Sequence, residues 1–387
     1  MKVAILTLSL HNNYGGILQN FALQRFLANN GFEPITINWT LSHTQSGSII
    51  SILRDFKSVF LHFAKGSALP KYKLTFSEES YIGINNIYFI DKYIVKTELL
   101  ESIESIIDLI KHSDFGAVVV GSDQCWRPRY IGKMLPLMFL NFFSNNKIRK
   151  ISYAASFGTD VWEFNPVMTN MARDWIKQFQ LVSVREQSGV RLCKEFLNVE
   201  SQWVLDPTFL LSKEEYISIV ESESVPKSDG NLMYYFLDPS VEKLRLINNI
   251  ATANDFVPFT AMPKYQAENR TKNNVKQEID SCVYPGVLVW LRGFIDADLI
   301  ICDSFHGCVF SIIFNKKFWV INNKDRGNAR LESLLRMFGL EERLIPADRL
   351  DIVYDGDSIE WNKINTIINS KKDYSGSILK KSLLDYA

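Results

Sequence analysis

Short apolar segments that end in turns of small and polar residues recur along this chain, and helical patterns separate them. Four of them read FGAVVVGSDQCW, RKISYAASFG, LVSVREQSG and SQWVLDPT. Their apolar residues run without alternation, which is typical of parallel strands covered by helices on both faces. At the N-terminus, a strand over Val3–Leu8, a helix that ends at Gly31 and a strand in EPITINW form one βαβ unit. The pattern predicts an α/β fold with parallel sheets.

The apolar pattern breaks once near the middle of the chain, where ESESVPKSDGN over residues 221–231 brings charge, proline and glycine. Because domains of about 100 to 200 residues are typical, a chain of 387 residues suits two of them. We expect two Rossmann-like domains facing a cleft, at residues 1–222, with an insertion at about 41–112, and at residues 223–345, followed by a helical tail at residues 346–387. Ligands of such sheets bind at the carboxyl ends of the strands.

Charge and cysteine content exclude several classes of function. Lysine plus arginine and aspartate plus glutamate number 43 each, so no overall field attracts nucleic acid or an anionic membrane. The five cysteines form no C-x-x-C pair, which favours a reducing, cytoplasmic compartment. The N-terminal apolar run lacks a signal-peptide cleavage site, and no run approaches the roughly 18 residues of a transmembrane helix. No spacing typical of a metal site, a dinucleotide site or a P-loop occurs, so we expect no metal and no cofactor.

A histidine lies in the turn between the two apolar segments of LIICDSFHGCVFSIIF. Leu299–Cys302 is predicted to be a buried strand and Val309–Phe314 the body of a helix, so His306 lies where such a sheet binds its ligand. In a purely structural interpretation, Asp303 or Ser304 caps the helix, and nearby backbone groups form hydrogen bonds with the ring nitrogens of His306. The alternative is a catalytic histidine.

Other predicted turns carry groups that bind anions or sugar hydroxyls. Gly15 and Gly16 precede a helix whose N-terminus favours an anion, although a tight turn explains them equally well. Arg185 ends a strand and suits a phosphate or carboxylate, with an ion pair to Glu186 or another acid as the slightly favoured alternative. GSDQCW offers a carboxylate, an amide and an indole for a sugar, or an Asx-type turn with a packed tryptophan. Asp206 is interpreted as a turn residue, with a functional role as the less favoured interpretation.

The chain resembles the polysaccharide pyruvyl transferase family in an ordered series of motifs from about residue 12 to about residue 340. The motifs are NNYGGILQNFAL, GSDQCW, ISYAASFG, SVREQSGVRL, VLDPTFLL, ADLIICDSFHGCVFSIIFNKKFWVI and ARLESLL. The resemblance implies a two-domain GT-B-like fold. It also implies transfer of a pyruvyl group from phosphoenolpyruvate to two hydroxyls of a sugar of a cell-surface polysaccharide or its precursor, with release of phosphate. A lipid-linked acceptor would place the protein at the inner face of the cytoplasmic membrane.

The resemblance also assigns roles to individual residues. Formation of the cyclic ketal needs a general acid and an anion clamp. His306 resembles the family's catalytic histidine and is predicted to be the acid, with the carboxylate of Asp303 favouring its charged form. Arg185 matches the arginine of the family's Ser-Val-Arg stretch and is the first candidate to bind the donor. The other predicted donor-binding residues are Arg330, Arg326, Ser304 and Gly307. The predicted acceptor-binding residues, chosen by their place in a GT-B cleft, are Asn13, Gly15, Gly16, Ser122, Asp123 and Gln124.

The segment that precedes the histidine departs from the family. Some members carry Arg-Leu-His where this chain has Ser304, Phe305 and His306, so an arginine suited to the donor is missing. Either Arg326 or Arg330 replaces it, or the donor differs from phosphoenolpyruvate. Two other functions therefore stay open. One is a GT-B glycosyltransferase that uses a nucleotide sugar, and the other is a non-catalytic saccharide-binding protein of a capsule-assembly complex.

Overall fold

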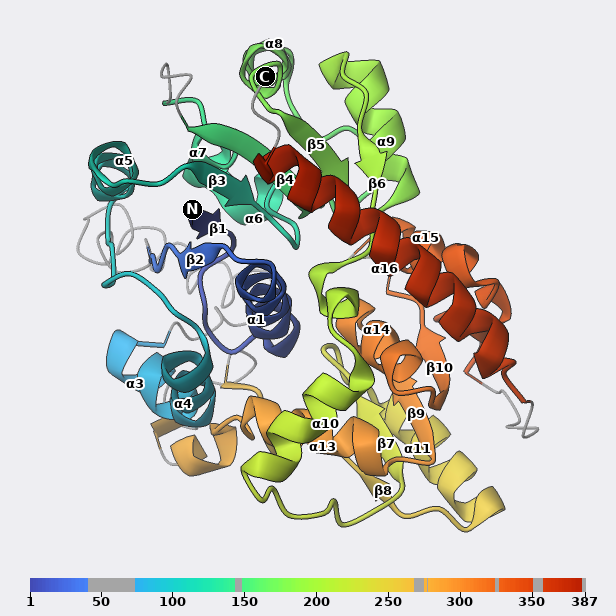
Figure 1. Cartoon of the computed structure of the whole chain (residues 1–387). Helices are drawn as coiled ribbons and strands as arrows, with labels where there is room; N and C mark the ends of the chain where they lie inside the picture. Colours follow the sequence, from blue (N-terminus) through green and yellow to red (C-terminus); the bar gives the residue numbers. More distant parts are fainter. Residues whose placement is uncertain are drawn as a thin grey trace, which may run out of the picture.

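The computed structural model describes residues 1–40, 74–142, 148–267, 275–276, 278–323, 327–350 and 358–384, which form two β-sheets covered by helices (Figure 1). The strand order of the first sheet is β2-β1-β3-β4-β5-β6, with bounds β1 (Lys2–Leu6), β2 (Glu33–Thr36), β3 (Ala117–Val120), β4 (Arg149–Ala155), β5 (Leu181–Val184) and β6 (Gln202–Trp203). The order of the second sheet is β11-β10-β9-β7-β8, with bounds β7 (Leu232–Tyr235), β8 (Pro258–Phe259), β9 (Leu299–Cys302), β10 (Lys317–Ile321) and β11 (Leu344–Ile345). These strands pair in parallel throughout. The predicted α/β class is confirmed.

Helices connect the strands and cover both faces of each sheet. In the first part of the chain they are α1 (Tyr14–Asn29), α3 (Phe76–Ile82), α4 (Ile84–Tyr93), α5 (Ile103–His112), α6 (Pro128–Ile131), α7 (Leu135–Met138), α8 (Pro166–Ile176), α9 (Gln187–Leu192) and α10 (Lys213–Ser222). Later helices are α11 (Val241–Asn254), α13 (Val287–Asp296), α14 (Phe305–Ile313), α15 (Ala329–Phe338) and α16 (Trp361–Leu384). Central strands are buried on both faces, as their uninterrupted apolar runs predict: all four residues of β3 and of β9 are buried.

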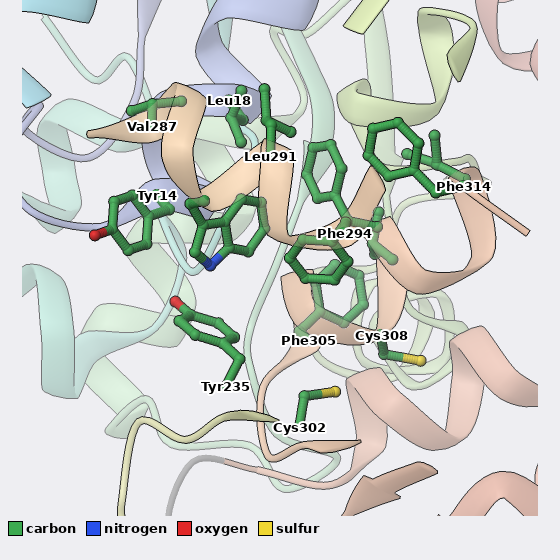
Figure 2. Close-up of a cluster of buried hydrophobic side chains, with 14 of the residues drawn as sticks. Tyr14, Leu18, Tyr235, Val287, Leu291, Phe294, Cys302, Phe305, Cys308 and Phe314 are labelled. Atoms are coloured by element: carbon green, nitrogen blue, oxygen red, sulfur yellow. The ribbon is translucent and has the colours of Figure 1, made fainter. Parts of the chain in front are cut away.

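The N-terminal part of α1 packs into the core of the second half. Tyr14 is stacked on Trp290 of α13, with ring centres 5.5 Å apart, and its hydroxyl donates to the carbonyl of Pro285 at 2.6 Å. Figure 2 shows Tyr14 and Leu18 beside Val287 of α13 in this cluster. The two sheets therefore share an apolar interface next to their strand ends, which fixes one sheet relative to the other.

Two helices lie away from the sheet that precedes them in sequence. Tyr216 of α10 packs against Phe310 of α14, with ring centres 5.2 Å apart, so α10 covers the second half. The long helix α16 returns to the first half, where its Leu379 and Leu383 are buried with Val3 of β1 (red in Figure 1). The C-terminal segment is helical as predicted, whereas the division at residue 222 stays a prediction.

The insertion predicted at about residues 41–112 is described in part. Residues 41–73 lie outside the described residues, and the remainder contains α3, α4 and α5. Within the described ranges, no helix combines the length and the apolar character that crossing a bilayer requires. All five cysteines are buried free thiols.

Candidate functional site

A cavity lies between the two sheets at the carboxyl ends of their strands. Strand order reverses between β1 and β3 in the first sheet and between β7 and β9 in the second, and turns that diverge at such a point leave a crevice. Turns after both pairs of strands line the cavity. The lining residues are Asn13, Asp123, Gln124, Tyr235, Leu237, Asp303, Ser304, Phe305, His306, Asn323, Gly327, Arg330 and Leu331.

His306 is the second residue of α14, directly after the turn that follows β9. Ser304 caps this helix, because its Oγ accepts a hydrogen bond from the N–H of Gly307 at 2.9 Å. The imidazole lies against the start of α1, where a Cβ on Gly15 would be 2.0 Å from Nδ1. A Cβ on Gly307 would likewise be 2.8 Å from the Cβ of Cys302. Both glycines therefore permit close approach, one between two helices and the other between α14 and β9.

Arg185, at the end of β5, forms a buried ion-pair network with two aspartates. Its side chain is 0% exposed, its Nη2 donates to Oδ1 of Asp123 at 2.7 Å and its Nη1 donates to Oδ2 of Asp206 at 2.7 Å. Burial favours loss of the proton, but the carboxylates outweigh it and raise the pKa of Arg185. Since two carboxylates already neutralise this guanidinium and it is not among the cavity-lining residues, the geometry gives no support to the predicted contact of Arg185 with a donor.

Asp206 also faces the histidine, with its Oδ2 3.7 Å from Nε2 of His306. Its Oδ1 accepts hydrogen bonds from the backbone N–H of Thr208 at 3.1 Å and from the Thr208 hydroxyl at 2.7 Å. Burial alone would raise the pKa of the Asp206 carboxyl, but His306, Arg185 and the Thr208 N–H hold it well below its usual range. Asp206 therefore both caps the turn that follows it and supplies negative charge beside the imidazole.

The structure corrects the carboxylate that the sequence predicted as the partner of His306. Asp303 accepts hydrogen bonds from the backbone N–H of Leu237 at 2.7 Å and from Nζ of Lys243 at 2.6 Å. Because β7 and β9 are neighbours in the sheet, a carboxylate at the end of β9 reaches the turn after β7 and is neutralised there. The carboxylate that faces the imidazole belongs to Asp206.

Arg330 lines the cavity from the first turn of α15. The ring centre of Phe305 lies 5.7 Å from Cζ of Arg330 and 4.3 Å from Cζ of Arg185. Burial and the charge of Arg185 lower the pKa of Arg330 to about 10, and nearby carboxylates oppose this effect. A guanidinium in a cavity wall suits a phosphate or a carboxylate. Arg326, the other candidate of this turn, lies outside the described residues.

Three of the predicted acceptor-binding residues reach the cavity directly. Asn13 caps α1, where its Oδ1 accepts from the N–H of Gly16 at 3.1 Å and its Nδ2 donates to Oδ2 of Asp123 at 3.4 Å. Gln124 follows Asp123, whose φ of 66° lies in the left-handed region that is uncommon for residues other than glycine. Ser122 is buried behind them, with its hydroxyl donating to a backbone carbonyl at 2.8 Å.

Three residues of the site with polar side chains were either missed by sequence reasoning or given a functional role only as the less favoured interpretation. Tyr235 ends β7 and Asn323 follows β10, and both line the cavity. Asp206 follows β6 and was interpreted mainly as a turn residue. The rule that ligands bind beyond the carboxyl ends of parallel strands, applied to every predicted strand, is the signal that finds all three.

Comparisons with known proteins bear on both family and fold. The family model for polysaccharide pyruvyl transferase matches residues 13–325. No curated protein sequence shows a significant match. Among solved structures, Arabidopsis thaliana UGT89C1 complexed with UDP-L-rhamnose has a TM-score of 0.53 at 10% identity, covering 99% of this chain and 98% of that chain. Methanocaldococcus jannaschii UDP-GlcNAc 2-epimerase in complex with UDP-GlcNAc and UDP has a TM-score of 0.48 at 14% identity, covering 98% and 99%. At such identities the first likeness shows the fold alone, and it confirms the predicted GT-B-like arrangement of two parallel sheets.

Proposed function

Because the chain belongs to the polysaccharide pyruvyl transferase family, we propose that it transfers a pyruvyl group from phosphoenolpyruvate to two hydroxyls of a sugar. The acceptor is a cell-surface polysaccharide or its precursor, the product is a cyclic ketal and the leaving group is inorganic phosphate. The observation that carries the proposal to individual residues is that His306, backed by Asp206, and Arg330 line one cavity.

His306 is proposed as the general acid. Its imidazolium gives a proton to the methylene carbon of the enol phosphate, so that the adjacent carbon becomes oxocarbenium-like. One sugar hydroxyl adds to that carbon and loses its proton, and the bond between carbon and the phosphate oxygen breaks with its electron pair on phosphate. The second hydroxyl then adds to the same carbon and loses its proton, which closes the ketal.

The donor is proposed to bind between Arg330 and the beginnings of two helices. Phosphoenolpyruvate carries a phosphate and a carboxylate, and a guanidinium binds either with two parallel hydrogen bonds. The N-caps of α1 and α14, Asn13 and Ser304, both line the cavity, so the positive ends of both helix dipoles point toward it. In this arrangement Arg330 takes the place of the arginine that the chain lacks at Ser304. Arg185 supports the site through Asp206.

The sugar is proposed to bind on the side of the first sheet. Asn13, Asp123 and Gln124 present amide and carboxylate groups that exchange hydrogen bonds with sugar hydroxyls, and Asn323 adds an amide from the second half. A lipid-linked sugar would bring the protein to the inner face of the cytoplasmic membrane. The family supports a saccharide acceptor, and the identity of the sugar belongs to the proposal.

Thermal unfolding with different donors tests the proposal. Phosphoenolpyruvate at a hundred times its dissociation constant should stabilise the native protein by about 2.7 kcal/mol, which raises the midpoint clearly. Arg330→Met should lose this shift. Arg336→Met is the matched control, because Arg336 lies exposed on the same helix and lines a different groove, so it should keep the shift.

The same experiment separates the second candidate function, a glycosyltransferase that uses a nucleotide sugar. This candidate is favoured by Ser304, which stands where some family members carry the arginine before the histidine. Stabilisation by UDP-sugars and none by phosphoenolpyruvate would replace the pyruvyl-transfer proposal with this one. Binding of saccharides with no donor effect and no release of phosphate or nucleotide would favour a non-catalytic protein.

A further inference from the structure

The imidazole of His306 is held between a helix and a carboxylate. On one side, Nδ1 is only 2.0 Å from the position that a Cβ on Gly15 would occupy, so the backbone of α1 limits the positions open to the ring. On another side Nε2 lies 3.7 Å from Oδ2 of Asp206, whose carboxylate is 0% exposed. His306 lines the cavity, whereas Asp206 is not among the lining residues. The carboxylate therefore acts on the ring from within the protein, out of contact with a ligand in the cavity.

Hydrogen bonds hold both oxygens of the Asp206 carboxylate. Its Oδ1 is fixed by the backbone N–H and the hydroxyl of Thr208, at 3.1 and 2.7 Å. Its Oδ2 accepts from Arg185 at 2.7 Å and lies 3.3 Å from the hydroxyl of Ser122. Arg185 and the N–H of Thr208 also help to keep the carboxyl ionised, because each stabilises the charged form. The result is a fixed negative charge that faces one ring nitrogen.

Other charged groups also lie near the imidazole of His306. Asp123 adds negative charge from the turn after β3, but it is shared with Arg185. Arg185 and Arg330 approach from β5 and α15 and lie against the ring of Phe305, the residue before the histidine. Two cations and the positive ends of α1 and α14 therefore lie near the ring. The carboxylate of Asp206 opposes these positive charges at Nε2.

We propose that Asp206 is the positioning residue of the acid. It orients the imidazole through Nε2 and stabilises the imidazolium, while Arg185 serves to fix Asp206. The catalytic part of this inference rests on the proposed function. Its chemical consequence is that Nδ1 gives up the transferred proton, so the neutral ring keeps its remaining proton on Nε2, facing Asp206. The carboxylate then favours uptake of the next proton at Nδ1.

Titration of the protein labelled with nitrogen-15 at its five histidines tests the inference without any substrate. The His306 signals are identified by their loss in His306→Gln. Asp206→Asn keeps the shape of the side chain and leaves Arg185 paired with Asp123, so it is expected to fold. Removing an opposite charge at this range should move the midpoint of the His306 titration to lower pH by about one unit or more.

Asp303→Asn is the matched control. It removes a buried carboxylate three residues before His306 that is bound to Lys243, and it should leave the His306 midpoint in place. An equal midpoint in Asp206→Asn and the native protein, or an equal shift in both variants, would overturn the inference.

The native protein gives a second test that needs no variant. Its neutral imidazole should carry the proton on Nε2, and a proton on Nδ1 would contradict the assigned orientation.

Kinetics separates this inference from the proposed function. With phosphoenolpyruvate, Asp206→Asn should lower kcat by tenfold or more with little change in KM for the donor, and its activity should decline at lower pH than that of the native enzyme. Asp206→Glu, which keeps the charge, should recover part of kcat. A native protein that is inactive with phosphoenolpyruvate refutes the proposed function but leaves the titration result valid. An active native enzyme whose kcat is unchanged in Asp206→Asn refutes the role of Asp206 alone.

Discussion

Gly15→Ala tests whether the imidazole of His306 has to lie against the start of α1. The added Cβ would be 2.0 Å from Nδ1, where ordinary contacts begin at 3.4 Å. The ring, the helix or both must therefore shift by about 1.4 Å in total to restore van der Waals contact. A displacement of about 1 Å in a catalytic group costs on the order of 100-fold in rate, so we expect kcat to fall by about that factor.

Gly16→Ala is the matched control for this experiment. It lies on the same helix and also replaces glycine by alanine, but the three atoms nearest its Cβ all belong to the side chain of Asn13, the closest at 3.0 Å. Alanine is favoured over glycine inside a helix by about 1 kcal/mol, so neither variant is expected to unfold α1. Phosphate released from phosphoenolpyruvate, with an acceptor found by screening sugars with adjacent free hydroxyls, measures kcat. If both variants fold and Gly15→Ala keeps kcat within about threefold of Gly16→Ala, the placement of His306 described above is refuted.

Three further predictions concern the charged groups of the site. His306→Asn should lower turnover by about two to four orders of magnitude. Phosphoenolpyruvate should still raise the midpoint of thermal unfolding of this variant. A variant with nearly full turnover would exclude His306 as the acid. Arg185→Met leaves the buried carboxylates of Asp123 and Asp206 unpaired, so the free energy of unfolding measured in urea should fall by about 3 to 5 kcal/mol. A loss under about 1 kcal/mol would mean that water reaches these carboxylates. Burial favours protonation of the Asp123 and Asp206 carboxyls, but Arg185 and His306 lower the pKa of both. The two carboxylates therefore stabilise the fold above pH 3.9 or so, which is about the pKa of aspartate in the unfolded chain, and this stabilisation is lost as the pH falls further. Urea unfolding at neutral and acidic pH should therefore show a smaller acid loss in Asp206→Asn than in the native protein, and equal losses would contradict the assignment.

The general fold was predictable because its signals are local. An uninterrupted apolar run such as that of β3 has the same meaning wherever it occurs, since a strand covered on both faces needs apolar residues at every position. The ordered motifs also predicted the family and the GT-B-like arrangement, and both are confirmed. His306 was predicted to follow β9 closely, and it does, although α14 begins at Phe305 and so includes the histidine that was predicted to lie in the turn. The roles of the site residues stay predictions.

The sequence by itself determined which side chains stand at the ends of strands, because strand, turn and helix patterns are read over a few neighbouring residues. It did not determine which of those side chains meet. Asp303 is three residues from His306 in the chain but bonds to Lys243, whereas Asp206, a hundred residues away in sequence, lies 3.7 Å from the ring. From the sequence, an ion pair of Arg185 was slightly favoured over contact with a donor, but only the packing of β3, β5 and the turn after β6 identified its partners as Asp123 and Asp206. Charges interact through space, so only the packing of one sheet edge against the other decided which carboxylate faces the histidine and which arginine lines the cavity.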